Sequence, residues 1–225
     1  MKRGHFITFE GPEGSGKSTQ IRLLAAHLHA CGVQTLLTRE PGGTSTGEAI
    51  RHLLQHESSD ADMDHRTEVL LFCASRAQIV AQVIRPALEQ GTWVLCDRFT
   101  DSTLAYQGYG RGFELEALRS LNHFATGGLT PDLTLLLDIP VEESFRRIRA
   151  RTAEIDRIER AAQTFHERLR LGYLQLAAAE PERFRLIQSA GSVEQTSSEV
   201  WKMVEWTFRI QQVSGVGNQI SETEL

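Results

Sequence analysis

The segment Gly11–Ser18 carries residue types whose spacing suits the binding of phosphate groups. It is Gly-Pro-Glu-Gly-Ser-Gly-Lys-Ser and fits the pattern G-x-x-x-x-G-K-[ST]. In this pattern the glycines let backbone N–H groups converge on phosphate oxygens, the lysine bridges phosphates and the hydroxyl binds Mg²⁺. We therefore predict a nucleotide phosphate site formed by Gly11, Pro12, Glu13, Gly14, Ser15, Gly16, Lys17 and Ser18.

The residues on either side of this segment supply the context that the pattern requires. His5–Phe9 is aromatic and β-branched, which predicts a strand, and apolar residues recur at helical spacing from Ile21 to Leu28. A glycine turn with a stray surface lysine is the alternative. Because the chain's other lysines, Lys2 and Lys202, lie near its ends, we favour the binding loop.

Length and composition indicate one globular domain and are compatible with a small anionic ligand. The chain has 225 residues, 40% of them hydrophobic and 24% charged, with a net charge of -5. A net negative charge argues against a general nucleic-acid binder, because such proteins displace phosphate counterions with a basic face. The polar N-terminus and the absence of a membrane-length apolar run predict a cytoplasmic protein without a membrane anchor. Cys31, Cys73 and Cys96 are expected to be buried free thiols.

Two further strands end in charged residues. Residues 34–38 predict a strand that leads into Arg39, and residues 92–97 predict a strand that ends in Asp97, followed by Arg98. Open α/β sheets bind ligands at the carboxyl ends of their strands. Arg39 is therefore a candidate phosphate ligand or a solvated loop arginine. Asp97 is a candidate Mg²⁺ ligand, as in other phosphate-loop enzymes, or the partner of Arg98 in a plain ion pair.

Two segments in the middle of the chain could bind a base. Phe72 and Arg76 are four residues apart on a predicted helix, so a ring and a guanidinium share one face. A core phenylalanine and a surface arginine are the alternative. The helix is expected to bend or end at Pro86. Residues 102–112 contain several glycines and predict a polar binding loop with Ser102, Thr103, Tyr106 and Gln107.

The remaining pattern predicts strands at 133–138 and 184–187 and helices near 115–125, 139–148, 165–176 and 200–208. Five short apolar strands that alternate with helices predict an α/β fold with a parallel sheet covered on both faces. We expect one domain over residues 1–210. The arginine-rich stretch at 146–160 is either a salt-bridged helical surface or a lid over polyphosphate, and residues 211–225 predict a disordered tail.

Four motifs together resemble those of bacterial thymidylate kinases in order and spacing. They are Phe9–Ser18, Thr38–Thr44, Asp97–Phe99 and Ser102–Gly108. The first is common to phosphate-loop proteins, whereas the other three are specific. The resemblance covers about Phe6 to Ile210 and implies the nucleoside monophosphate kinase type of the P-loop NTPase fold. It also implies a homodimer that transfers the γ-phosphoryl group of ATP-Mg to dTMP, giving dTDP for dTTP synthesis.

The resemblance also implies roles for the residues at the phosphate end of the site. Lys17 neutralises charge on the moving phosphoryl group, Ser18 holds Mg²⁺, and Asp97 holds Mg²⁺ or orients Arg98. Glu13 lies near the sugar of dTMP, while Arg39 and Arg98 grip the acceptor phosphate. Gly14 stands where some family members carry an arginine, so the lid should supply that charge, with Arg151 first and Arg149 and Arg157 next.

At the base end the resemblance implies that Phe72 stacks on thymine and that Arg76 reaches its carbonyl. Ser102, Thr103 and Gln107 line the base pocket, and Tyr106 packs where a ribose hydroxyl would clash. Other readings remain: a different deoxynucleotide or nucleoside kinase of this fold, a GTPase switch, or a non-catalytic nucleotide-binding module. The chain lacks the Asn-Lys-x-Asp motif that reads guanine, which argues against the GTPase.

Overall fold

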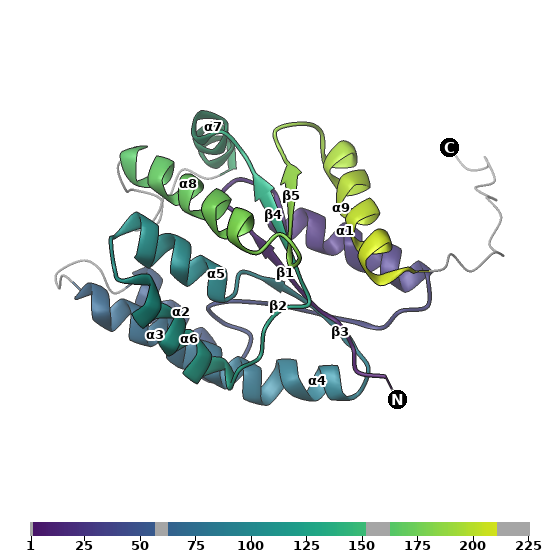
Figure 1. Cartoon of the computed structure of the whole chain (residues 1–225), viewed down its shortest axis with the longest axis horizontal. Coiled ribbons are helices and arrows are strands. Elements are labelled where there is room, and N and C mark those ends of the chain that lie inside the picture. Colours follow the sequence, from purple (N-terminus) through teal and green to yellow (C-terminus); the bar gives the residue numbers. More distant parts are fainter. Residues whose placement is uncertain (1, 57–62, 152–162, 211–225) are drawn as a thin grey trace.

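Five parallel strands form the central sheet of the computed structural model, which describes residues 2–56, 63–151 and 163–210. Their spatial order is β2-β3-β1-β4-β5 (Figure 1). The strands are β1 (Phe6–Glu10), β2 (Thr35–Arg39), β3 (Trp93–Asp97), β4 (Leu133–Asp138) and β5 (Phe184–Gln188). The predicted α/β fold with five parallel strands is therefore confirmed, with strand ends that shift by a residue at most.

Helices cover both faces of the sheet (Figure 1). One face is covered by α1 (Lys17–Ala30) and α9 (Val193–Phe208), which contact each other. The opposite face is covered by the other helices, among them α3 (His65–Ile79), α4 (Arg85–Glu89), α6 (Leu115–Thr126) and α8 (Gln163–Ala179). The helices α2 (Ser45–His56) and α7 (Val141–Arg151) follow β2 and β4.

The three central strands β1, β3 and β4 are largely buried, because helices cover both faces of the sheet there. Ile7 and Phe9 of β1 pack into the cluster that includes α1 and α9, whereas Phe6 packs with the segment before β3. Successive side chains of a strand point to opposite faces, so the two clusters alternate along β1. Glu10, at the end of this strand, is also fully buried.

The segment expected to be a polar binding loop is helical instead. It forms α5 (Thr100–Thr103) and the π-helix η2 (Leu104–Gly110), and most of η2 is buried. The prediction of a loop was wrong because it assumed that polar side chains and glycines face water. Here Ser102, Thr103 and Gln107 bind buried partners from distant parts of the chain, so the backbone can stay helical.

The long helix before β3 does not end at Pro86. It passes from α3 through the π-helix η1 (Val80–Ile84) into α4, so Pro86 lies in the first turn of α4. Pro86 follows directly on the π-helical turn, where the regular hydrogen-bond pattern of the α-helix is already interrupted, so its missing N–H is tolerated. The whole run, His65–Glu89, is long and apolar enough to span a membrane, with a mean hydropathy of 1.3 over its most apolar 18 residues, of which 44% are buried. Its side chains Ile79 and Ile84 are fully buried, which indicates a core helix.

Other predictions fall partly outside the described residues. Most of the arginine-rich stretch, and the predicted tail at 211–225, lie there, so the domain bounds, the lid and the tail stay predictions. Within α7, Arg146 and Arg147 pair with Glu143, as on a salt-bridged helix. All three cysteines are free thiols as expected, although Cys31 is only half-buried.

Helix α8 approaches η2 so closely that only glycine fits at the contact. A Cβ atom added at Gly172 would lie 2.5 Å from Cβ of Tyr109. We expect Gly172→Ala to lower the melting temperature by about 5 °C, since overpacking costs about 1–3 kcal/mol in a chain of this size. Thermal unfolding followed by circular dichroism measures this. The neighbouring exposed Leu171→Ala is the control and should change the melting temperature little, and equal shifts would contradict the packing argument.

Candidate active site

The loop between β1 and α1 folds around its lysine. Gly16 has a φ of 92° and leads into α1, which begins at Lys17. The Lys17 ammonium is buried and donates to the carbonyl oxygens of Gly11 at 3.1 Å and Pro12 at 2.9 Å. Burial, together with the nearby Arg98 charge, lowers the pKa of Lys17. A phosphate is a better partner for this ammonium than two carbonyls, because it brings a compensating charge.

Two oxygen donors meet beside the lysine. The Ser18 hydroxyl of α1 donates to Oδ2 of Asp97 at 2.8 Å, across 79 positions of sequence. Asp97 ends β3 and is paired in register with Phe9 of β1 and Arg39 of β2. A hydroxyl and a carboxylate are hard oxygen ligands, which suits Mg²⁺ when phosphates and waters complete its coordination. The donor set of Ser18 and Asp97 therefore fits the predicted metal.

Arg98 is held in an unusual backbone conformation. Its φ is +70°, a value that non-glycine residues adopt rarely and that tends to occur at functional sites. Its N–H donates to the carbonyl of Phe9 at 3.0 Å, and its carbonyl accepts from the Cys96 thiol at 3.1 Å. Burial raises the pKa of Cys96 well above its usual range, so the thiol keeps the proton that it donates. These two bonds fix the backbone that aims the arginine.

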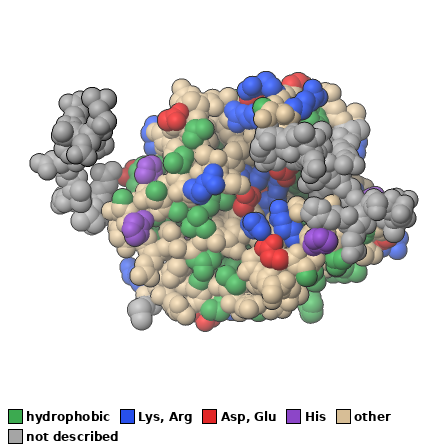
Figure 2. Space-filling model, turned by 180° about the vertical axis from the view of Figure 1, so that it is seen from behind, with side chains coloured by type: hydrophobic (Ala, Val, Ile, Leu, Met, Phe, Trp, Pro, Cys, Tyr) green, Lys and Arg blue, Asp and Glu red, His purple; other side chains and the backbone are tan. Residues whose placement is uncertain are grey.

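The Arg98 guanidinium points at the phosphate loop. It donates to the Gly11 carbonyl at 3.1 Å, to the Ser102 hydroxyl at 3.2 Å and to the Tyr173 hydroxyl at 3.1 Å, and it pairs with the Glu13 carboxylate. The guanidinium carbon lies 5.0 Å from the centre of the Tyr106 ring. Lys17 and Arg98 thus share one end of the sheet. Figure 2 shows acidic and basic side chains gathered in a hollow near the middle of one face of the molecule.

The buried carboxylate of Glu10 links the segment after β3 to α5 and α8. Its carboxylate accepts from the Phe99 N–H at 2.8 Å, from the Ser102 hydroxyl at 2.6 Å and N–H at 3.3 Å, and from the Tyr173 hydroxyl at 3.0 Å. Burial and the nearby Asp101 raise the pKa of Glu10 to about 7, against the opposing effect of Arg98. Ser102 and Tyr173 also bind Arg98, so Glu10 sets the positions of two hydrogen-bond partners of Arg98.

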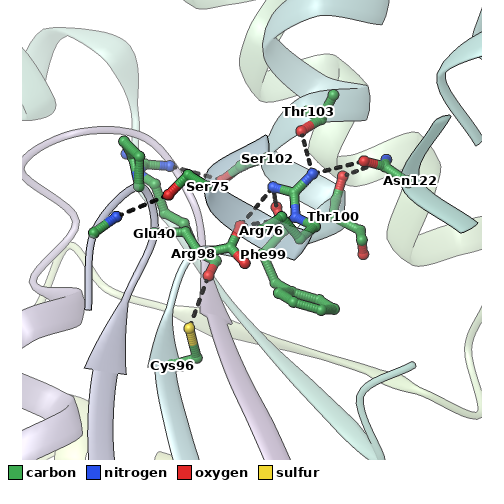
Figure 3. A network of polar contacts seen from close by, with 12 residues as sticks. Glu40, Ser75, Arg76, Cys96, Arg98, Phe99, Thr100, Ser102, Thr103 and Asn122 are labelled. Atoms are coloured by element: carbon green, nitrogen blue, oxygen red, sulfur yellow. Dashed lines mark hydrogen bonds and ion pairs between the residues drawn. The ribbon is translucent and has the colours of Figure 1, made fainter. Parts of the chain in front are cut away.

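The proposed base-binding residues lie on α3 and on α5–η2. Phe72 is half-buried and belongs to none of the apolar core clusters of the described residues, so part of its ring is accessible. Arg76 is buried, which excludes the alternative of a surface charge. Figure 3 shows its guanidinium in a polar network, where it donates to Glu40 at 2.8 Å, Thr103 at 3.0 Å, Asn122 at 2.6 Å and the Phe99 carbonyl at 3.0 Å.

All three guanidinium nitrogens of Arg76 thus donate to acceptors within the protein. Its predicted contact with a thymine carbonyl stays a prediction, and such a contact would have to share one of these donors. Thr103 and Gln107 lie near α3, since Gln107 donates to Glu68 at 2.9 Å. Ser102 instead lies beside Arg98, at the phosphate end. Tyr106 is buried under Arg98.

Arg39 stands apart from this group. Its backbone is in register with Asp97, but its side chain is half-exposed and pairs with Glu48 of α2 at 3.0 Å. It lines a shallow pocket with Leu36 and Val83 on the outer side of β2. Arg39 thus ends β2 at the same end of the sheet as Asp97, with its guanidinium bound to a surface carboxylate, and its role as a phosphate ligand stays a prediction.

Helix α7 docks on the phosphate loop at Gly14. The Ser144 hydroxyl donates to the Glu13 carbonyl at 2.6 Å, and Arg147 donates to the Gly14 carbonyl at 3.4 Å. Gly14 has a φ of +71°, and a Cβ there would lie 2.9 Å from the Ser144 carbonyl oxygen. An arginine at this position does not fit under α7. Arg151 ends α7, and its side chain and Arg157 lie outside the described residues; Arg149 is exposed.

Sequence reasoning missed the buried residues that hold the site together. Glu10, Glu68, Cys96 and Tyr173 contact the predicted residues, although the sequence-based predictions assigned none of them a role at the site. One signal was available: a glutamate that ends an otherwise apolar strand needs a partner, because a buried carboxylate without one is costly. Nothing local marked Tyr173, which meets Glu10 across 163 positions.

The phosphate loop follows β1 of a parallel sheet, and the oxygen pair of Ser18 and Asp97 and a buried arginine lie at the same end. These features are typical of a phosphate-loop nucleotide phosphotransferase. A family model described as thymidylate kinase matches residues 9–200. Thymidylate kinases of a Synechococcus species and Pseudomonas syringae pv. tomato are both 50% identical to the chain, over 89% and 92% of it and 94% and 98% of their own lengths. That of Deinococcus radiodurans is 48% identical over 91% of the chain and 98% of its own length. The chain belongs to the thymidylate kinase family.

The raised pKa of Glu10 predicts a pH effect on stability. Its folded pKa of about 7 exceeds its ordinary value of 4.5, so the folded state binds this proton more tightly than the unfolded state does. Stability from this group is therefore present below pH 4.5 and is lost as the pH rises to 7. Between pH 5 and pH 8 we expect the melting temperature of the native protein to fall by about 5 °C more than that of Glu10→Gln.

Differential scanning fluorimetry at matched ionic strength measures both curves, and subtracting the variant removes titrations that the two proteins share. The charged or titratable neighbours that act on Glu10 or sense it are Asp101, Arg98, Tyr173, Lys17, Arg76 and Cys96. Parallel curves would show that Glu10 does not titrate in this range.

Proposed function

We propose that this protein transfers the γ-phosphoryl group of ATP to the phosphate of dTMP, giving dTDP and ADP for dTTP synthesis. The observation that carries the proposal is the convergence of Lys17, Ser18, Asp97 and Arg98 at one end of the sheet, in a chain of the thymidylate kinase family. As a member of that family the protein is an ATP-dependent kinase, and the alternative of a different nucleotide or nucleoside kinase is not favoured.

On the donor side, residues 11–18 hold the phosphates of ATP. Lys17 exchanges its two carbonyl partners for phosphate oxygens, because a buried ammonium is better compensated by an anion. Ser18 and Asp97 hold Mg²⁺, which when bound neutralises phosphate charge. The protein's part is then to align the donor and to supply fixed positive charge where negative charge is spread over the moving group.

On the acceptor side, Arg98 and Arg39 bind the phosphate of dTMP. The second pKa of a phosphate monoester is near 6, so the acceptor is mostly a dianion at neutral pH and needs no general base. Repulsion between the two nucleotides is the main obstacle, and arginines that face the acceptor reduce it. Glu13, which pairs with Arg98, lies near the sugar, where it helps to align the dTMP.

At the base end, Phe72 stacks on thymine, Arg76 approaches a carbonyl, and Thr103 and Gln107 line the pocket. Ser102, also expected to line the pocket, lies beside Arg98 and so nearer the acceptor phosphate. Tyr106 packs beneath the sugar and favours deoxyribose. Arg151 is the first choice for a lid arginine that arrives on closure and helps to exclude water. These roles are supported by the family's motifs and by the positions of α3, α5 and η2.

We also infer a cytoplasmic homodimer that binds no nucleic-acid polymer and no membrane. The neighbouring helices α3 and α6 carry large exposed apolar side chains, Leu70 and Phe124, the latter 87% exposed. Large exposed apolar side chains favour contact with a partner. The net charge of -5 supports the absence of polymer binding.

An assay of ADP release with different acceptors tests the reaction. We expect ATP-dependent turnover with dTMP, weaker turnover with dUMP and with the ribonucleotide TMP, and none with thymidine. The physical reason is that thymidine lacks the phosphate that the arginines bind, and that a ribose hydroxyl meets Tyr106. Preferred turnover of dCMP, thymidine or a guanine nucleotide would contradict the proposed substrate.

Removing the loop lysine tests the donor site. Lys17→Met keeps the length of the side chain but removes its charge, so we expect kcat to fall by about 100-fold or more. The matched control is Lys202→Met, an exposed position on α9, which should leave the rate unchanged. Steady-state kinetics with dTMP and ATP measures both. Full activity of Lys17→Met would exclude the phosphate loop as the donor site.

A further inference from the structure

One face of α3 carries three side chains at four-residue intervals: Glu68, Phe72 and Arg76. Each interval advances about 6 Å along the helix, which is close to the width of a pyrimidine ring. Arg76 binds Thr103 at one end of this face, and Glu68 binds Gln107 at the other. The half-buried ring of Phe72 lies between them along the helix. A base stacked on Phe72 therefore has polar groups of η2 and α5 along its edge.

Glu68 is fully buried and firmly held. Its carboxylate accepts from Nε2 of Gln107 at 2.9 Å and pairs with the Arg111 guanidinium at 3.0 Å. Arg111 is 14% exposed, so this ion pair is shielded from water on the Glu68 side. A carboxylate in an ion pair with a guanidinium accepts hydrogen bonds and does not donate them.

This contact fixes which way the Gln107 amide points. A glutamine amide has a donor end and an acceptor end, and its orientation follows from its partners. Because Glu68 accepts only, the NH₂ group must face it, and the carbonyl oxygen Oε1 must face the other way. Among the described residues, Oε1 of Gln107 receives no hydrogen bond. The side chain thus presents an acceptor that the protein does not use.

We propose that Glu68 is a positioning residue that sets base specificity by holding Oε1 of Gln107 toward the edge of the bound base. The inference rests on the proposed function. Thymine carries a hydrogen on N3 and donates to such an acceptor, whereas N3 of cytosine is itself an acceptor and is repelled by it. A buried polar group that meets the wrong partner discriminates strongly, because its hydrogen bond is lost on binding.

The competing explanation is that Glu68 and Gln107 only tie α3 to η2. A purely structural link predicts that its loss weakens folding and lowers turnover of every acceptor alike. A positioning role predicts instead a change in the ratio of kcat/KM for dTMP to that for dCMP. The two explanations therefore differ in the ratio of kcat/KM for the two acceptors, and not only in the overall rate.

The experiment compares wild type, Glu68→Gln, Gln107→Met and the double variant with dTMP and dCMP as acceptors. In Glu68→Gln the new amide can offer either end to Gln107, so the orientation of Oε1 is no longer fixed. We expect the dTMP preference to fall about tenfold, mainly through a higher KM for dTMP. In the Gln107→Met background, Glu68→Gln should cause no further loss of preference. Glu199→Gln, an exposed position on α9, is the matched control.

An unchanged ratio in Glu68→Gln, an equal loss with both acceptors, or additive effects in the double variant would each overturn the proposal. A crystal structure of wild type with dTMP tests it without relying on a variant that folds poorly. Thymine N3 should lie within hydrogen-bond distance of Oε1 of Gln107, and a base whose N3 meets another group would overturn it. Wild type that turns over no dTMP would instead reject the proposed function.

Discussion

The buried carboxylate of Glu10 is the interaction on which the end of the sheet depends. Leaving such a group unpaired inside a protein is strongly unfavourable, so its position requires donors that approach from several sides. They come from three parts of the chain: the Phe99 N–H after β3, Ser102 on α5 and Tyr173 on α8. Because Ser102 and Tyr173 also bind Arg98, satisfying one anion places one cation beside the phosphate loop.

The segment Thr100–Gly110 connects the Arg98 cluster to the side chains of α3 that form the proposed base end. Ser102 binds Glu10, Thr103 binds Arg76, and Gln107 binds Glu68. Each polar side chain meets a buried charged group, so the segment is buried as helix although its composition is that of a loop. Its π-helical turn changes the direction of successive side chains, as such turns do at many functional sites. One short segment thus fixes the distance between the two ends of the site.

The sequence predicted what local patterns determine. The phosphate loop, the five strands and the charged residues after β2 and β3 follow from spacing and apolar periodicity, and the structure brings Lys17, Asp97 and Arg98 to one edge of the sheet. The sequence did not predict the helix at Thr100–Gly110, because what allows it is non-local. Gln107 meets Glu68 across 39 positions, and Ser102 meets Glu10 across 92. No local pattern records such pairs.

Three arginines of the proposed site are paired with carboxylates. The more deeply such a pair is buried, the more it costs to replace the carboxylate by a phosphate. The Arg39–Glu48 pair is about half-exposed, and such a surface pair contributes about 0–1 kcal/mol, so little free energy opposes its exchange for a phosphate. Arg98, 14% exposed beside Glu13, lies between the two extremes. Arg76 and Glu40 are at most 3% exposed, and breaking a buried pair of this kind costs about 3–5 kcal/mol. We therefore propose that Arg76 stays with Glu40, and that phosphate recognition falls to Arg39 and Arg98.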